Sequence, residues 1–384
     1  AVDFGFGEDQ ELLRAATRRF LAEHQSLADT RRSIEAPDVF DADLWRQGAA
    51  LGWTAMLIPT ERGGGSITEQ PLVDLVVLAE ELGRTLHPGP FVPCNVVAGA
   101  VARFGTEAQA AESLPRLASG EATAAWCLSG DGSPEPSSVE VRAVPAGDGG
   151  WRLDGVARYV QAAENASVLL VVANDPDGAV TSFLVPSPSP GLSARTLSGL
   201  DVTRRFAEVR FEGVTVQSAH SLSGGQDAVD YCVALATVLQ SAESVGAADV
   251  LFEATVDYLK QRVQFGRTIG SFQAIKHRLA NLLLRLEAMR AAAHYAALAL
   301  GDDLDDAAEA VATAGAYVDD AFAFICGEAL QLHGGIGFTW EHDVHLFTRR
   351  AKVNQVLYGD GAWHRERLVQ LLEDAVAIGT GTEG

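Results

Sequence analysis

The sequence predicts an α+β fold that is mostly helical, with one β unit between two helical regions. Apolar residues recur with a helical period at both ends of the chain, and near its middle they alternate or form short runs. Turns rich in glycine and proline separate these segments. At 384 residues, the chain is long enough for two or three packed units. We therefore expect an N-terminal helical domain at 1–122, a middle β domain at 123–220 and a C-terminal helical bundle domain at 221–384.

The N-terminal region shows helical periodicity. One apolar stripe is formed by Leu12, Ala16 and Phe20, with Leu13 and Leu21 flanking them. Helical spacing resumes over 72–82, where a glycine and two prolines then end it. These patterns predict helices that each bury one face.

The middle region carries strand signals. Residues 139–143 alternate, 147–150 form a glycine-rich hairpin turn, and 168–173 form a continuous apolar run. A second turn at 174–178 precedes another apolar segment. The pattern closes with Val209, Phe211, Val214 and Val216. An all-β unit is expected here.

The helical period returns from about Gln226 onward. Three apolar faces follow: Leu251, Thr255 and Leu259 with Phe252, Val256 and Val263; Ile275, Leu279, Leu282, Leu283 and Leu286; and Val311, Val318, Phe322 and Ile325. Alanines between them allow close helix packing, so a four-helix arrangement is expected. A final helix is expected over 364–377.

Charge and cysteine usage exclude several functions. A net charge of −22 argues against nucleic acid or an anionic membrane as the main partner, because both need a basic surface. The four cysteines are scattered without a CxxC pair, so neither a disulfide framework nor a metal site is expected. The N-terminal residues lack a basic and apolar leader, and 168–173 is too short to span a bilayer. A cytoplasmic protein is expected.

The segment 327–368 contains two glycine turns, GGIG and YGDG. Three motifs of this segment are informative: Gln331–Phe338 (QLHGGIGF), Glu341 and Arg349–Arg350. Two more, Arg262–Gly266 (RVQFG) and Phe272–Gln273, lie upstream of it. In order and spacing, the chain resembles the acyl-CoA dehydrogenases, FAD enzymes that desaturate acyl-CoA thioesters between Cα and Cβ. The resemblance covers nearly the whole chain and implies that family's fold: an N-terminal helical domain, a middle β domain and a C-terminal four-helix bundle.

The resemblance also implies two groups of FAD-binding residues. Leu128 and Ser129 match the strand that meets the flavin ring, and Tyr159 and Gln161 match the segment beside flavin N5, where a hydroxyl residue is usual in place of Gln161. The residues expected to reach the FAD of a neighbouring subunit are Arg262, Phe265, Phe272, Gln273, Gln331, Gly334 and Gly335. Without the resemblance, Ser129 and Gln161 could equally well be ordinary strand-edge polar groups, and Arg262 could be a solvated helix residue.

The catalytic base departs from the family pattern. The family's usual glutamate falls on Gly359, and the alternative position on an earlier helix falls at or near Ala236. Neither residue can take a proton, and a positioned base is typically worth ~10²–10⁴ in rate. Asp360 is the nearest replacement, whereas Glu243 and His364 are further candidates.

Several functions remain open at this point. The preferred hypothesis is a base-lacking subunit of a heterotetrameric acyl-CoA dehydrogenase acting on a bulky, steroid-derived acyl group, with the glutamate supplied by a homologous subunit. Electron-transfer flavoprotein would be the acceptor. The alternatives are a self-sufficient homotetramer using Asp360 or another carboxylate, a flavin oxidase or monooxygenase on the same fold, and a non-enzymatic acyl-CoA binder.

Overall fold

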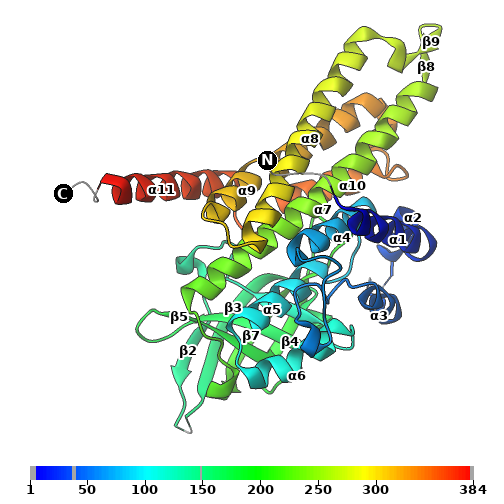
Figure 1. The fold of residues 1–384 in the computed structure, drawn as a ribbon. Coiled ribbons are helices and arrows are strands. Elements are labelled where there is room, and N and C mark those ends of the chain that lie inside the picture. Colours follow the sequence, from blue (N-terminus) through cyan, green and yellow to red (C-terminus); the bar gives the residue numbers. More distant parts are fainter. Residues whose placement is uncertain (1–5, 37–39, 148, 381–384) are drawn as a thin grey trace. The chain divides into compact units, whose positions relative to one another are not determined.

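The computed structural model describes residues 6–36, 40–147 and 149–380 (Figure 1). The α-helices in these ranges are α1 (Glu8–His24), α2 (Leu27–Ser33), α3 (Ala42–Ala50), α4 (Pro71–Arg84), α5 (Phe91–Phe104), α6 (Glu107–Ala118), α7 (Gln226–Gln261), α8 (Gln273–Gly301), α9 (Ala307–His333), α10 (Val344–Asn354) and α11 (Gly361–Thr380). The strands are β1 (Ala124–Cys127), β2 (Arg142–Pro145), β3 (Trp151–Gln161), β4 (Val168–Asn174), β5 (Val180–Pro186), β6 (Leu192–Leu197), β7 (Phe206–Val216), β8 (Val263–Gln264) and β9 (Arg267–Thr268).

The fold class is confirmed: a mixed sheet lies in the middle of the chain, with helices before and after it. The chain forms two compact units. Among the described residues, one comprises 6–31, 76–87 and 237–380, and the other comprises 32–36, 40–75, 88–147 and 149–236. We call them the helical unit and the sheet unit. The division into three consecutive domains stays a prediction.

The sheet unit is built on seven strands in the order β1-β4-β2-β3-β7-β6, with β5 also paired to β4. Strands β1 and β2 pair with β4 in parallel, and the remaining pairs are antiparallel. Helix α5 packs against β1. The long antiparallel pair β3–β7 carries the irregularity on which the candidate site depends.

The strands expected at 168–173 and 209–216, and the apolar segment after the turn at 174–178, are confirmed as β4, β7 and β5. The strand expected at 139–143 begins only at Arg142, and the turn expected at 147–150 includes Asp148, which lies outside the described residues. Asp175 Oδ1 accepts the backbone N–H groups of Asp177 (2.9 Å) and Ala179 (2.8 Å), which closes the turn between β4 and β5. Alternate residues of the sheet enter one core that includes Leu153, Phe183 and Phe211. The full length of β3 was not anticipated, because its apolar residues are interrupted by charged ones.

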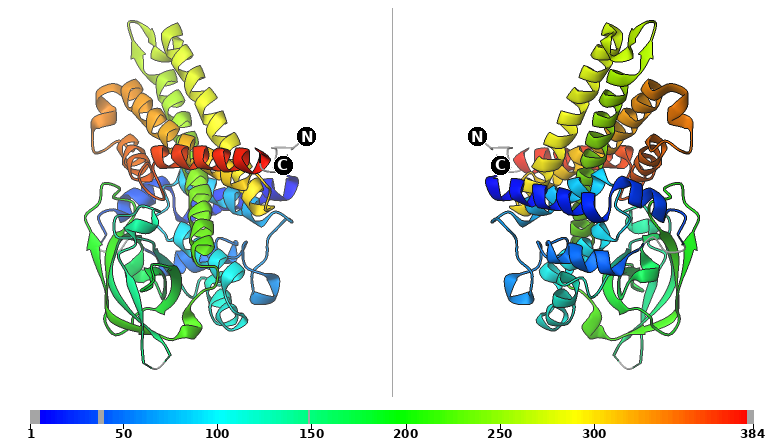
Figure 2. Two further views of the ribbon diagram at one scale, coloured as in Figure 1. Left: turned by 90° about the vertical axis from the view of Figure 1, so that its left-hand side faces the viewer. Right: turned by 90° about the vertical axis from the view of Figure 1, so that its right-hand side faces the viewer.

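The helical unit contains α8 to α11, the hairpin β8–β9 and most of α7. Helix α9 packs against α8, α10 and α11. Figures 1 and 2 show the β8–β9 hairpin at the tip of α7 and α8, which it connects.

Two glycines let α4 and α7 cross closely inside the helical unit. A Cβ atom on Gly83 would lie 2.0 Å from the carbonyl oxygen of Glu243, and one on Gly246 would lie 1.8 Å from that of Glu80. Any side chain at either glycine would therefore force the helices apart.

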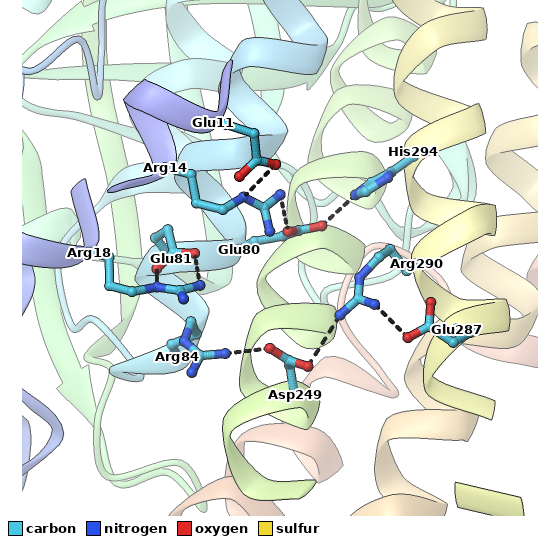
Figure 3. Close-up of polar contacts among 10 residues, drawn as sticks. All are labelled: Glu11, Arg14, Arg18, Glu80, Glu81, Arg84, Asp249, Glu287, Arg290 and His294. Carbon is cyan, nitrogen blue, oxygen red and sulfur yellow. Dashed lines mark hydrogen bonds and ion pairs between the residues drawn. The ribbon is translucent and has the colours of Figure 1, made fainter. Parts of the chain in front are cut away.

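The same crossing carries a network of ionic contacts (Figure 3). Glu80 is buried, and its two oxygens contact His294 Nε2 (2.5 Å) and Arg14 Nη2 (3.0 Å). Burial by itself would raise the pKa of Glu80. The hydrogen bond and charge of His294, with the charges of Arg14 and Arg290, outweigh that effect and hold the pKa below its ordinary value.

One sequence expectation, the apolar stripe of α1, needs correction. The buried face of α1 includes Leu13 and Leu21, whereas Leu12 is 62% exposed, so the stripe predicted through Leu12 was wrong. The true face combines apolar with polar residues such as Thr17, which hides it from a purely apolar pattern.

The segment Ala307–Phe338 is long and apolar enough to cross a membrane, but 61% of its apolar window is buried inside the protein, as in a core helix.

Candidate functional site

The sheet unit brings together two segments that are far apart in the sequence. The backbone N–H of Arg158 donates to the carbonyl of Ser129 at 3.0 Å, which joins the end of β1 to β3. A Cβ atom on Gly132 would lie 3.2 Å from Tyr159 Cδ2, so the glycine lets the loop after Ser129 pack on that ring. Ser129 Oγ accepts the N–H of Gly132 at 3.0 Å, and its own O–H can still donate. The expected pair of flavin-ring segments is therefore one local structure.

A bulge in β3 sets the directions of its last residues. The pairing with β7 shifts register between Ala157 and Val160, and Tyr159 in the bulge has φ +57°. Tyr159 is 50% exposed, whereas Gln161 is 4% exposed. Bulges commonly redirect side chains beside functional sites.

The hairpin β8–β9 in the helical unit displays one aromatic ring. Phe265 and Gly266 occupy its two-residue turn with φ +53° and +75°, the conformation that tight hairpins require. Phe265 is 92% exposed, and its ring meets that of Phe272 edge-on at 6.2 Å. The guanidinium of Arg267 stacks over Phe272 at 3.9 Å. The neighbouring Arg262 and Gln273 are also exposed.

The glycine loop after α9 lies beside the end of α7. The ring of His333 stacks on Tyr258 at 4.6 Å, and the hydroxyl of Tyr258 donates to the carbonyl of His333 at 3.2 Å. Burial lowers the pKa of His333, so the stacked ring is neutral near pH 7. Gly334 has φ +64°. Sequence reasoning named neither Tyr258 nor His333 as a positioning residue; the only available signal was their nearness to Arg262 and Gly334.

The expected cross-interface residues are thus gathered by the helical unit. Gln331 is exposed, and Cβ atoms placed on Gly334 and Gly335 would have no heavy atom within 4 Å. Arg262, which follows Tyr258 by one helical turn, is connected through the Tyr258–His333 contact to the same glycine loop. This loop and the hairpin offer an open backbone, a cation and an aromatic ring to a ligand.

The turn at Tyr358–Gly359, where the resemblance expects a glutamate, has a left-handed backbone. Tyr358 and Gly359 have φ +58° and +98°. Asp360 is exposed, and its Oδ1 accepts the N–H of Trp363 at 2.8 Å, as a residue capping the start of α11 does. Asp360 therefore already has a structural role, and its function as a base stays a prediction.

The other candidate bases are enclosed. His364 packs against Gly315, where a Cβ atom would lie 2.5 Å from the imidazole. Burial lowers the pKa of His364 to about 4, and the backbone of Tyr358 and the charge of Asp360 oppose this only in part. Glu243 is buried on α7, and so is Ala236, the alternative position of the family's glutamate, which has no ionisable group. Within the ranges that the structure describes, no group of three or more His, Cys, Asp or Glu is placed to hold a metal ion.

The comparisons with known proteins decide the family. The N-terminal domain of the acyl-CoA dehydrogenases matches residues 7–121, and their C-terminal domain matches 224–372. The acyl-CoA dehydrogenase IpdE2 of Mycobacterium tuberculosis is 30% identical over 350 residues, which cover 90% of this chain and 91% of that protein. The chain belongs to the acyl-CoA dehydrogenase family. It is therefore placed among oxidoreductases that use FAD.

Solved acyl-CoA dehydrogenase structures agree over almost the full length. A variant of the steroid acyl-CoA dehydrogenase Tcur3481–Tcur3483 is 30% identical with a TM-score of 0.86, covering 97% of this chain and 99% of that one. The ChsE4–ChsE5 complex of M. tuberculosis is 26% identical with a TM-score of 0.87 and the same coverage. Butyryl-CoA dehydrogenase of Megasphaera elsdenii, at 22% identity and a TM-score of 0.88, shows the shared fold.

The residues present fit a flavin dinucleotide. In the sheet unit, Gln161 Oε1 is buried and has no hydrogen-bond partner among the described residues, as expected of an atom that a ligand completes. In the helical unit, the open backbone at Gly334 and Gly335 and the exposed side chain of Arg262 suit a phosphate-bearing group. Both groups of residues remain candidates for this role.

Proposed function

We propose that this chain is an FAD-dependent acyl-CoA dehydrogenase subunit that lacks its own base and works with a homologous subunit carrying the catalytic glutamate. The observation that carries this proposal is Gly359, a buried glycine with a left-handed backbone, at the position where the resemblance expects the family's base. The reaction is α,β-desaturation of an acyl-CoA thioester, in which the partner's carboxylate removes the α-proton.

The substrate and the assembly are inferred from relatives. A similar solved protein is named a steroid acyl-CoA dehydrogenase with two components, and another is the ChsE4–ChsE5 complex. These support a bulky, steroid-derived acyl group and a heterotetramer of two homologous chains. Electron-transfer flavoprotein is proposed as the acceptor, and the cytoplasm as the location.

In this proposal the residues of the chain have separate roles. Ser129, Leu128, Tyr159 and Gln161 hold a flavin ring. Arg262 pairs with a pyrophosphate, since a guanidinium matches its geometry and charge. The other residues proposed to hold a neighbouring subunit's FAD are Phe265, Phe272, Gln273, Gln331, Gly334 and Gly335. When bound, FAD accepts the β-hydrogen of the substrate as hydride.

A second candidate is a self-sufficient homotetramer in which Asp360 is the base. Its support is the exposed carboxylate next to Gly359. The capping bond from Trp363 to Asp360 Oδ1 disfavours it, because a base must turn toward the substrate's α-carbon and would then leave the start of α11 uncapped.

Purification of the chain alone and with a co-expressed homologue tests the proposal. We expect the isolated chain to be inert toward acyl-CoA and the complex to contain FAD and to reduce an electron acceptor. Replacing the partner's glutamate by glutamine should abolish that activity, whereas Asp360→Asn in this chain should preserve it. An isolated chain that is yellow and active would refute the proposal.

A further inference from the structure

Gln161 lies in the most strained stretch of the central strand pair. Tyr159, two residues before it, and Ala162, directly after it, have φ +57° and +56°. Left-handed backbone is costly for residues other than glycine, and it persists where the surrounding structure holds it, often at binding sites. Here the hydrogen bond from Ala162 N–H to the carbonyl of Arg205 (3.0 Å) anchors the second of these residues.

The amide of Gln161 has a defined orientation. Its Nε2 donates to the carbonyl of Gly89 at 3.4 Å. Rotating the amide by half a turn would place its oxygen against that carbonyl oxygen, and two acceptors would repel one another. The nitrogen therefore faces Gly89, and Oε1 is the atom presented on the other side.

The side-chain oxygen Oε1 of Gln161 lacks a hydrogen-bond donor among the described residues. Gln161 is 4% exposed, and Oε1 contacts no hydrogen-bond donor among the residues that the structure describes. Buried acceptors are almost always satisfied, so a donor is expected to arrive with a bound group. The Ser129 hydroxyl accepts the N–H of Gly132, and no hydrogen bond joins it to Gln161 Oε1 among the described residues.

We infer that Gln161 presents a hydrogen-bond acceptor to the flavin and so favours its reduced form, an inference that rests on the function proposed above. Full reduction takes up two electrons and two protons, one at N5 and one at N1. Oxidised N5 can only accept a hydrogen bond, and reduced N5 can donate one. The resemblance to the family places the Tyr159–Gln161 segment beside N5. A hydroxyl at position 161 could donate to oxidised N5; the Gln161 oxygen cannot.

Gln161 is therefore a positioning residue that biases the redox equilibrium of the bound cofactor. The acceptor oxygen repels the lone pair of oxidised N5 and pairs with the hydrogen of reduced N5. In a chain that lacks a base but carries glutamine at this position, hydride acceptance from the substrate would be more favourable.

The test is the midpoint potential of FAD bound to the full-length protein, in the assembly that retains it. Gln161→Leu removes the acceptor and Gln161→Thr supplies a hydroxyl donor. We expect both substitutions to lower the midpoint potential by about 30 mV. For a two-electron couple, this shift corresponds to a tenfold smaller ratio of reduced to oxidised flavin at a fixed solution potential. Gln226→Leu is the matched control, because Gln226 bonds only to Asp230 on its own helix among the contacts described, and it should leave the potential unchanged.

The outcomes separate this inference from the proposed function. FAD retained with a potential that is unchanged or higher in both variants contradicts the inference and leaves the proposed function standing. Absence of FAD from the chain, both alone and with its homologue, contradicts both. If Gln161→Leu fails to fold, Gln161→Thr decides, since its smaller polar side chain is the one usual in the family at this position.

Discussion

A Cβ atom on Gly359 would lie 2.4 Å from Cε3 of Trp363, a separation that real side chains do not reach. Trp363 is in the first turn of α11, and Gly359 is buried beneath it with φ +98°. The turn is therefore adapted to glycine both in its backbone and in its packing. A larger side chain at position 359 would therefore meet the ring of Trp363 as well as an unfavourable backbone conformation.

Gly359→Glu should fail to create a base in the isolated chain and should destabilise it. Left-handed backbone costs a residue other than glycine ~1–2 kcal/mol, and overpacking adds ~1–3 kcal/mol. Gly359→Ala adds only a Cβ atom and so tests the backbone conformation and the nearest contact. Its free energy of unfolding, measured with urea, should be lower by about 2 kcal/mol. Gly327→Ala is the control: its Cβ would meet no atom within 4 Å, and the change should be neutral or stabilising. Desaturation by Gly359→Glu would contradict the expectation.

Glu80→Gln should destabilise the helical unit in a pH-dependent way. The folded pKa of Glu80 lies below its ordinary value of 4.5, so its stabilisation is fully present above about pH 4.5 and is lost as the pH falls through the folded pKa. At pH 7 the loss should be on the order of 3 kcal/mol, because breaking a buried pair leaves its partners uncompensated. Unfolding curves of the unsubstituted protein and of Glu80→Gln, recorded from pH 3 to 7, measure the difference between their free energies of unfolding. This difference should become smaller in acid.

Glu287→Gln is the control for that experiment. Its carboxylate also pairs with an arginine, Arg290, but its side chain is 54% exposed, and such pairs contribute less than about 1 kcal/mol. If Glu80→Gln and Glu287→Gln lower the free energy of unfolding equally, burial does not strengthen the contacts of Glu80.

His364 should make the protein acid-sensitive in the mildly acidic range. Burial lowers its folded pKa to about 4, below the ordinary 6.5, so the neutral form is stabilised. The corresponding stability is present above pH 6.5 and is lost as the pH falls from there through 4, amounting to about 3 kcal/mol. His364→Gln should show a shallower decline of stability over this interval. An identical decline in both proteins would assign the acid sensitivity to other groups.

Arg262→Ala should weaken FAD retention in the assembled protein without unfolding it. The side chain is exposed, so little packing is lost, and a charge-assisted hydrogen bond of ~1.5–3 kcal/mol corresponds to a roughly 10- to 100-fold weaker affinity. Arg367→Ala, an exposed arginine on α11, is the control. Flavin fluorescence during dilution measures the release, and equal retention in both variants would exclude Arg262 from the site.

Much of the fold could be predicted from the sequence because its elements carry periodic apolar patterns. Helix α9 buries all four residues expected on its face, among them Val318 and Phe322. The pattern failed at α1, where Thr17 is fully buried and Leu12 faces water. Alternation could not reveal β3 in full, because the bulge at Tyr159 interrupts its period.

The residues of the candidate site could be named from the sequence only where they belong to a motif shared with the family. The resemblance named Ser129 and Gln161, but the contact from Arg158 to Ser129 that joins their strands is a long-range pairing with no local signal. Similarly, the sequence shows that Gly359 lacks a side chain, whereas the ring of Trp363 beside it is visible only in three dimensions. Residue identity shows that position 359 has no ionisable side chain, and the packing of Trp363 is the reason we expect Gly359→Glu to fail to restore a base.

Exchange of the α-hydrogen of a bound acyl-CoA with deuterium oxide tests the central claim most directly, because it measures proton abstraction without needing an electron acceptor. The isolated chain should give no exchange above the rate of the free thioester, and the complex with a glutamate-bearing homologue should exchange rapidly. Exchange by the isolated chain that disappears in Asp360→Asn would contradict the claim and establish Asp360 as its base.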